Sequence, residues 1–290
     1  MERMVELFIK NLQRKNYSKA TISEYERELH RFIDYLKKLG KDFKEMDRFD
    51  VEEYIFDLNI ADRTQNRALS VIRSFCKFLQ DRGYITENPA KQVEFAKVRT
   101  KNPVFLTDEE LTKLRKVLEA EKDDLIGLRN KTIVKLFVST GLRVSELVNL
   151  KVEDVNLDDS GAVLEVRRKG QEMDYVYVNK KTTQDLAKYL NLRKKMSLSH
   201  NYLFISKNYR PLDRSNVYRL VKNIFFKAGI EKKKMGPHVL RHTFATILMK
   251  SNVSIYKIKR LMNHKQLSTT ERYLHVVEDD LRKTVEEIDI

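Results

Sequence analysis

The chain has 290 residues, 41% of them hydrophobic and 34% charged, which allows two domains of ordinary size and excludes one small binding module. It contains no run of 18 apolar residues, and its start lacks the apolar core of a signal peptide, so we expect a cytoplasmic protein without a membrane span. The net charge of +15 predicts salt-sensitive binding to nucleic acid or, as the alternative, a solvated lysine-rich surface.

Apolar residues recur at three- and four-residue steps through the first 80 residues, which is typical of amphipathic helices. The longest stripes run from Ser18 to Leu39 and from Leu69 to Leu79, and shorter helices are predicted over 5–12 and 51–58. We therefore expect an all-helical domain over residues 1–95, with its periodic aromatic residues in the core. The single cysteine, Cys76, belongs to the same apolar run and is predicted to pack there, and one cysteine excludes an intrachain disulfide.

Residues 96–104 hold three cations and a proline without an apolar period, which predicts an interdomain linker. Thr107, with Glu110 three residues later, has the capping-box pattern that begins a helix, and a mostly apolar helix is predicted over 125–138. The second domain is expected over 105–290. It carries most of the positive charge, because 37 Lys and Arg face 25 Asp and Glu after residue 100, against 20 and 17 before it.

Strand-forming residues are confined to the middle of the second domain. The β-branched and aromatic runs at 162–167 and 175–178 are joined by a basic segment, which predicts a hairpin. Helical patterns return at 182–195 and 213–228 and dominate after residue 238. The predicted fold class is mainly α, with a small antiparallel sheet in the second domain.

Four short motifs collect side chains that suit chemistry at a phosphodiester. Arg143 lies in Thr-Gly-Leu-Arg-Val-Ser-Glu-Leu, and the other motifs are Pro-His-Val-Leu-Arg-His with His238 and Arg241, Leu-Met-Asn-His with His264, and Ser-Thr-Thr-Glu-Arg-Tyr with Tyr273. A guanidinium matches two phosphate oxygens, an imidazole moves protons near neutrality, and a phenol can act as a nucleophile. The sequence has neither a Gly-rich phosphate loop nor metal-ligand spacing.

These motifs, in this order and at these spacings, resemble the tyrosine recombinase (phage integrase) family, and within it the Xer-type site-specific recombinases. The likeness extends over nearly the whole chain, because Asn16 to Tyr25 and Glu87 to Ala90 look like the opening and close of that family's SAM-like core-binding domain. The resemblance implies a double-stranded DNA substrate, cut and rejoined without a metal, ATP or another cofactor.

The resemblance implies that Tyr273 is the nucleophile, forming a 3′-phosphotyrosyl intermediate. It assigns Arg143 and Arg241 to the nonbridging phosphate oxygens and Glu146 to the orientation of Arg143. Without the motifs, Tyr273 would be predicted to pack half-buried and each arginine to form a structural salt bridge, for Arg143 with Glu146. Asn263 departs from the family, which usually has Gly before the second histidine, and Asn tolerates the same left-handed backbone.

The resemblance also assigns the proton-transferring and hydrogen-bonding groups. His238 would be the general base for the tyrosine, or alternatively a helix-capping histidine. His264 would donate a hydrogen bond to the phosphate, and Lys169, at the hairpin tip, would protonate the departing 5′ oxygen or only contact a phosphate. His242 and His275 match no functional position and are predicted to be structural.

The expected function is that of a site-specific recombinase resolving chromosome dimers, with four protomers at two DNA sites and two domains clamping each duplex. The alternatives are a mobile-element integrase, a type IB topoisomerase-like enzyme, or a catalytically silent DNA-binding regulator. Apolar residues at helical steps near the carboxy terminus predict a tail that docks on a neighbouring protomer: Leu281, Val285 and Ile288. The target sequence, and any accessory translocase or paralogous partner, are not predicted.

Overall fold

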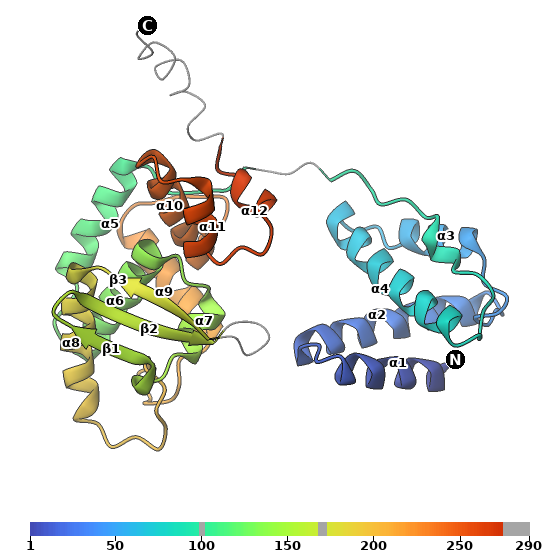
Figure 1. The fold of residues 1–290 in the computed structure, drawn as a ribbon, viewed down its shortest axis with the longest axis horizontal. Helices are drawn as coiled ribbons and strands as arrows, with labels where there is room; N and C mark the ends of the chain where they lie inside the picture. The colour runs from blue at the N-terminus through green and yellow to red at the C-terminus, as the bar shows by residue number, and fades with distance from the viewer. Residues whose placement is uncertain (99–101, 168–172, 275–290) are drawn as a thin grey trace, which may run out of the picture. The chain divides into compact units, whose positions relative to one another are not determined.

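The computed structural model describes residues 1–98, 102–167 and 173–274 (Figure 1). The chain divides into two compact units, Met1–Thr100 and Lys101–Ile290. Within the described ranges, no helix combines the length and the apolar character needed to cross a membrane.

The described part of the first unit is helical, as predicted. Its elements are α1 (Glu2–Arg14), α2 (Lys19–Lys38), α3 (Arg48–Asp57), α4 (Asp62–Asp81) and a 3-10 turn, η1 (Pro89–Lys91). The Ser18 side chain caps α2 by accepting a hydrogen bond from the Thr21 amide, which satisfies one of the open amides of its first turn.

The apolar stripes of these helices meet in one core. Phe8 of α1 lies with its ring centroid 5.3 Å from that of Phe75 on α4. Cys76 is fully buried beside them, and burial raises the pKa of its thiol to about 12. The prediction of a core cysteine is therefore confirmed. The ordered backbone of this unit continues past residue 95, because the Asn66 amide exchanges two hydrogen bonds with the Ala96 backbone.

The second unit combines a helical core with one sheet. Its described elements are α5 (Asp108–Ala120), α6 (Leu125–Thr140), α7 (Val144–Asn149), the 3-10 turn η2 (Val152–Asp154), β1 (Val155–Asp158), β2 (Gly161–Arg167), β3 (Met173–Val178), α8 (Lys180–Lys194), α9 (Arg214–Lys227), α10 (Pro237–Lys250), α11 (Ile255–Leu261) and α12 (Ser268–Glu271). The capping box predicted at Thr107 is confirmed at the start of α5. The apolar α6 packs against α8, α10 and β3, so it forms the centre of the unit.

The sheet has the order β1-β2-β3 and is antiparallel throughout. The predicted hairpin is β2 and β3, with Ala162 opposite Val178 and Arg167 opposite Met173. Its apolar side chains alternate inward, whereas Tyr175 and Tyr177 are exposed. The third strand, β1, was not predicted, because its Asn and Asp residues weaken the strand pattern and pairing with β2 along an edge supplies its order.

The described chain between residues 237 and 274 is helical, as expected, but turns break it into three helices. Asn252 and Asn263 adopt the left-handed conformation at those breaks, with φ of 55° and 47°. Figure 1 shows α10, α11 and α12 gathered at one end of the second unit, and α11 packs on both of its neighbours.

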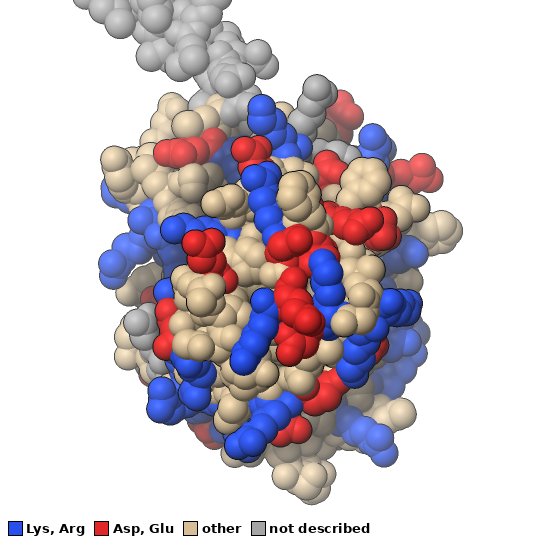
Figure 2. Space-filling view, turned by 90° about the vertical axis from the view of Figure 1, so that its right-hand side faces the viewer, with Lys and Arg blue, Asp and Glu red and all other residues tan. Residues whose placement is uncertain are grey.

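The surface carries charges of both signs. On the face drawn in Figure 2, acidic side chains lie near the centre, with Lys and Arg side chains on several sides of them. The net charge of +15 therefore does not form one uniform positive field over this face.

Candidate active site

The first arginine lies at the junction of α6 and α7. Gly141 ends α6 with φ of 63°, and Arg143 follows as the residue before the first turn of α7. Glu146, which is buried, accepts hydrogen bonds from the Arg143 amide at 2.7 Å and from Arg143 Nη1 at 2.8 Å. The other nitrogen, Nη2, donates to the carbonyl oxygen of Asn263 at 2.9 Å. This geometry orients the guanidinium, whose side chain remains 39% exposed.

The second arginine, Arg241 on α10, is only 7% exposed. Its Nη1 donates to the carbonyl of Gly141, and its Nη2 donates to that of Met262 at 2.6 Å. The two guanidiniums therefore connect the turn after α6 to the turn after α11, which are distant in the sequence. The left-handed backbone expected at Asn263 is confirmed, and it presents the carbonyl that Arg143 binds.

His264 follows directly in the same turn. Its Nδ1 lies 2.8 Å from Oγ1 of Thr270 in α12. Burial, and then the charges of Arg241 and Arg143, lower the pKa of His264 to about 4. The imidazole is therefore neutral at pH 7, a state that suits hydrogen bonding and packing.

Tyr273 lies just after α12 and is only 2% exposed. Its ring packs in a small apolar cluster with Phe244 of α10 and Met262. Burial raises the pKa of Tyr273 to about 12, although the charges of Arg241 and Arg272 act in the opposite direction. At neutral pH the phenol is therefore protonated and shielded from water.

The phenol forms a hydrogen bond with His242, a residue that was predicted to have only a structural role. Tyr273 Oη lies 2.6 Å from Nδ1 of His242, whose pKa is lowered to about 4 by burial and then by His238, Arg272 and Arg241. The available signal was helical spacing, because His242 follows His238 by four residues and therefore shares its helix face.

His238 occupies a different position on α10. Its ring centroid lies 6.0 Å from that of Tyr218 on α9, and its pKa is lowered by burial and by Arg241 and Lys234. Within the part of the chain that the structure describes, the hydrogen bond of the Tyr273 phenol goes to His242 and not to His238.

Lys169, the predicted acid, lies outside the described residues. The hairpin that carries it is connected to the site through Asp174 of β3, whose carboxylate accepts a hydrogen bond from Asn263 Nδ2 at 3.2 Å. Among the described residues, no group of three or more His, Cys, Asp or Glu side chains is arranged to hold a metal ion.

Comparison with known proteins gives matches to both units. Residues 104–279 match the family described as "Phage integrase family", and residues 5–83 match "Phage integrase, N-terminal SAM-like domain". The "Tyrosine recombinase XerC" of Bacillus pumilus (strain SAFR-032) is 34% identical over 98% of this chain and 95% of its own length.

Solved structures have the same fold. A XerH site-specific recombinase bound to a palindromic difH substrate in a post-cleavage complex matches with a TM-score of 0.80 at 22% identity, over 94% of this chain and 81% of that one. A XerA recombinase matches with a TM-score of 0.57 at 28% identity, over 100% of this chain and 99% of that one.

Proposed function

The chain belongs to the phage integrase family of tyrosine recombinases, and from that premise we propose which residues of this chain cut and rejoin DNA and in what biological setting. The family cleaves and rejoins DNA through a tyrosine intermediate, and this chain is a site-specific recombinase of that family. DNA is accordingly its substrate.

The proposed reaction is a transesterification at one backbone phosphate. Tyr273 Oη attacks the scissile phosphorus, the bond to the 5′ oxygen breaks, and a 3′-phosphotyrosyl bond forms. Because that linkage conserves the energy of the broken bond, an incoming 5′ hydroxyl can reverse the step without ATP. Lys169 supplies the proton that the departing 5′ oxygen takes up.

Arg143 and Arg241 bind the nonbridging oxygens, where two permanent charges stabilise the more negative pentavalent state. Glu146 orients Arg143, and His264 donates a hydrogen bond to the same phosphate. The observation that carries the assignment is the convergence of both guanidiniums on consecutive carbonyls, of Met262 and Asn263, directly before His264. His238 is the base that the family pattern favours.

A nicked suicide duplex carrying the cognate site tests the chemistry, because loss of the short 5′ fragment traps the covalent protein–DNA adduct. We expect an adduct with the wild type and none with Tyr273→Phe, which loses the nucleophile but keeps the ring. Tyr256→Phe, at a tyrosine that is 71% exposed on α11, is the matched control and should react normally. An adduct with Tyr273→Phe would contradict the assignment.

The biological role proposed is resolution of chromosome dimers, which fits the XerC name of the similar protein from Bacillus pumilus. The rival role within the family is integration of a mobile element, and the rival activity is relaxation of supercoils at any sequence. Mapping bound DNA in the source cell separates the first two, because a dimer resolvase should concentrate at one chromosomal site. Relaxation of a plasmid lacking that site would favour the topoisomerase-like activity.

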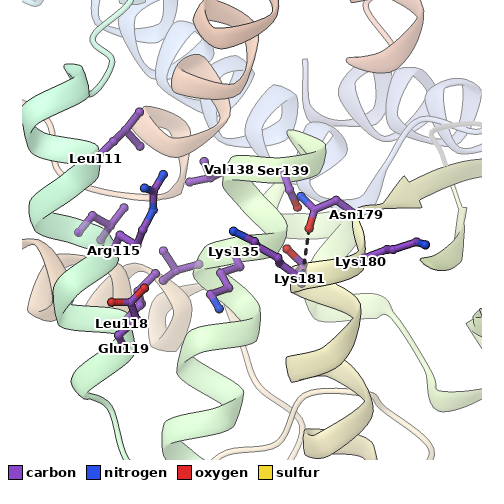
Figure 3. A pocket seen from close by; sticks show the side chains of 13 residues that line it. Leu111, Arg115, Leu118, Glu119, Lys135, Val138, Ser139, Asn179, Lys180 and Lys181 are labelled. Carbon is purple, nitrogen blue, oxygen red and sulfur yellow. Dashed lines mark hydrogen bonds between the residues drawn. The ribbon is translucent and has the colours of Figure 1, made fainter. Parts of the chain in front are cut away.

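Four protomers are proposed to act on two DNA sites, with the tail after residue 280 docked on a neighbour. The tail lies outside the described residues, but its composition is informative: residues 275–290 hold six Asp and Glu against two Lys and Arg. Figure 3 shows a matching hollow between α5, α6 and the start of α8, where apolar side chains lie among basic ones: Leu111, Leu114, Leu118, Val134, Val138, Arg115, Lys135, Lys180 and Lys181.

We propose that the tail binds in this hollow, because its apolar lining complements the apolar residues of the tail, and its basic side chains outnumber the one acidic side chain that lines it, Glu119. Deletion from residue 281 onward, and separately Val138→Glu in the hollow, should reduce cooperative assembly on a two-site duplex while leaving single-site binding intact. If the deletion variant assembled with unchanged cooperativity, the proposal that the tail docks on a neighbouring protomer would be wrong. If the deletion reduced cooperativity and Val138→Glu did not, the tail would bind at a site other than this hollow.

A further inference from the structure

The nucleophile candidate has a basic partner that the family pattern does not assign to it. Nδ1 of His242 lies 2.6 Å from Tyr273 Oη, and the two rings are 5.7 Å apart at an angle of 52°. His242 lies on α10 directly after Arg241 and one turn after His238, so it shares the helix face of His238. The phenol is thus held against the helix that carries the second arginine.

The direction of this hydrogen bond follows from burial. Tyr273 is 2% exposed, and among the described residues its oxygen makes this one hydrogen bond. A buried hydroxyl hydrogen requires an acceptor. If His242 donated from Nδ1, the phenolic hydrogen would have none, so the phenol donates and the imidazole carries its own proton on Nε2.

A purely structural explanation is available, because buried tyrosines ordinarily find a hydrogen-bond partner. Such a partner is usually a backbone carbonyl, which cannot take up the proton. Here the acceptor is an imidazole nitrogen, the arrangement in which a nucleophile is paired with its base in covalent catalysis. Burial is the largest influence on the phenol and raises its pKa to about 12, whereas the charges of Arg241 and Arg272 act in the opposite direction and favour the phenolate.

We propose that His242 Nδ1 accepts the phenolic proton of Tyr273 as the phosphotyrosyl bond forms, an inference that rests on the proposed function. The Oη–H bond breaks as the Oη–P bond forms, and the proton moves to Nδ1 to give an imidazolium. The P–O5′ bond breaks, and the 5′ oxygen takes its proton from the acid proposed above. In rejoining, the 5′ hydroxyl attacks phosphorus and returns its proton to Lys169, the Oη–P bond breaks, and Tyr273 Oη takes back the proton held by His242.

The charges around His242 make proton transfer dependent on bound DNA under this proposal. The charged groups around His242 are His238 and Arg241 on α10, Lys234 before it, Arg272 beside Tyr273, and His264 in the preceding turn. Burial is the largest cause of the lowered pKa of His242, and the neighbouring positive charges act in the same direction, so both disfavour an imidazolium. A DNA phosphate brings the negative charge that stabilises it, and attack on phosphorus makes the phenol oxygen progressively more acidic.

The test combines variants at the histidines with a more acidic nucleophile. Adduct formation on the suicide duplex is timed for the wild type, His242→Ala, His242→Asn and His238→Ala, each with tyrosine or 3,5-difluorotyrosine at position 273. Asn places an amide oxygen where Nδ1 stood, so it keeps the hydrogen bond without a base and maintains the fold if Ala does not. DNA binding by gel shift controls for assembly of the complex.

We expect both His242 variants to form adduct about 10²- to 10⁴-fold more slowly, the usual contribution of a general base, with DNA binding retained. Difluorotyrosine should restore most of that loss in the His242 variants and little in His238→Ala, because a more acidic phenol depends less on its base. Wild-type rate in His242→Asn, or rescue confined to His238→Ala, would overturn the proposal in favour of His238. Absence of any adduct with the wild type would instead refute the proposed function.

Discussion

Arg241 and Arg143 donate hydrogen bonds to consecutive backbone carbonyls, Arg241 to that of Met262 at 2.6 Å and Arg143 to that of Asn263 at 2.9 Å. Two side chains separated by almost 100 positions are thereby held side by side on the turn that follows α11. The turn continues into His264, so the same contacts also place the second histidine.

Lysine substitutions should separate the structural roles of the two arginines. Arg241 is buried and binds two carbonyls, so Arg241→Lys, with one compact donor group, should cost about 1.5–3 kcal/mol of unfolding free energy. Arg143 is partly exposed, so Arg143→Lys should cost about 1 kcal/mol or less. Both should slow adduct formation by about 10²-fold or more. Urea unfolding and the suicide-duplex assay measure the two effects, and equal stability losses would contradict this account.

Gly141→Ala should damage the site through the turn that carries its carbonyl. Its φ is 63°, which costs other residues about 1–2 kcal/mol, and a Cβ there would lie 2.5 Å from Cδ1 of Phe244, which adds about 1–3 kcal/mol. Gly229→Ala is the matched control, because it has φ of 61° and open space around the added methyl. The difference in urea midpoint between the two variants isolates the contact with Phe244, and equal midpoints would rule that contact out.

Stability should fall as the pH is lowered from 7 towards 5. His238, His242 and His264 have folded pKa values below their ordinary 6.5, so the unfolded chain binds more protons in this window and gains stability relative to the native state. The stability that depends on these histidines being neutral is fully present above pH 6.5 and is lost as the pH falls towards 4.

Urea midpoints across this range measure the effect. His242→Asn should flatten the slope, because it removes one of the three histidines whose pKa is lowered on folding. Carboxylates with lowered pKa, such as Glu110 and Asp123, lose their contribution only below about pH 4.5 and do not confuse the comparison. A slope identical to that of the wild type would show that His242 titrates alike in both states.

Cys76 should be inert in the native protein. It is fully buried and its pKa is raised to about 12, so almost no thiolate is present to react at neutral pH. A thiol reagent should label it only on unfolding, which makes the labelling rate a measure of opening of the first unit. Rapid labelling in the absence of denaturant would contradict the burial.

Periodicity and capping patterns identified most of the helices, because an amphipathic stripe and a capped first turn are local properties. The stripe after Ser18 and the capping box at Thr107 are confirmed by α2 and α5. Strand β1 was missed because its order depends on pairing with β2 and not on its own residues.

The sequence by itself determined the family and the set of side chains suited to a phosphodiester, since short motifs at fixed spacing carry that information. The tertiary structure alone decided which groups meet: Arg241 with the turn after α11, and Tyr273 with His242 in place of His238. Helical spacing puts both histidines on one face of α10, but the packing of α12 against the preceding helices selects the one that the phenol reaches. That packing depends on side chains far apart in the chain, which no local pattern reports.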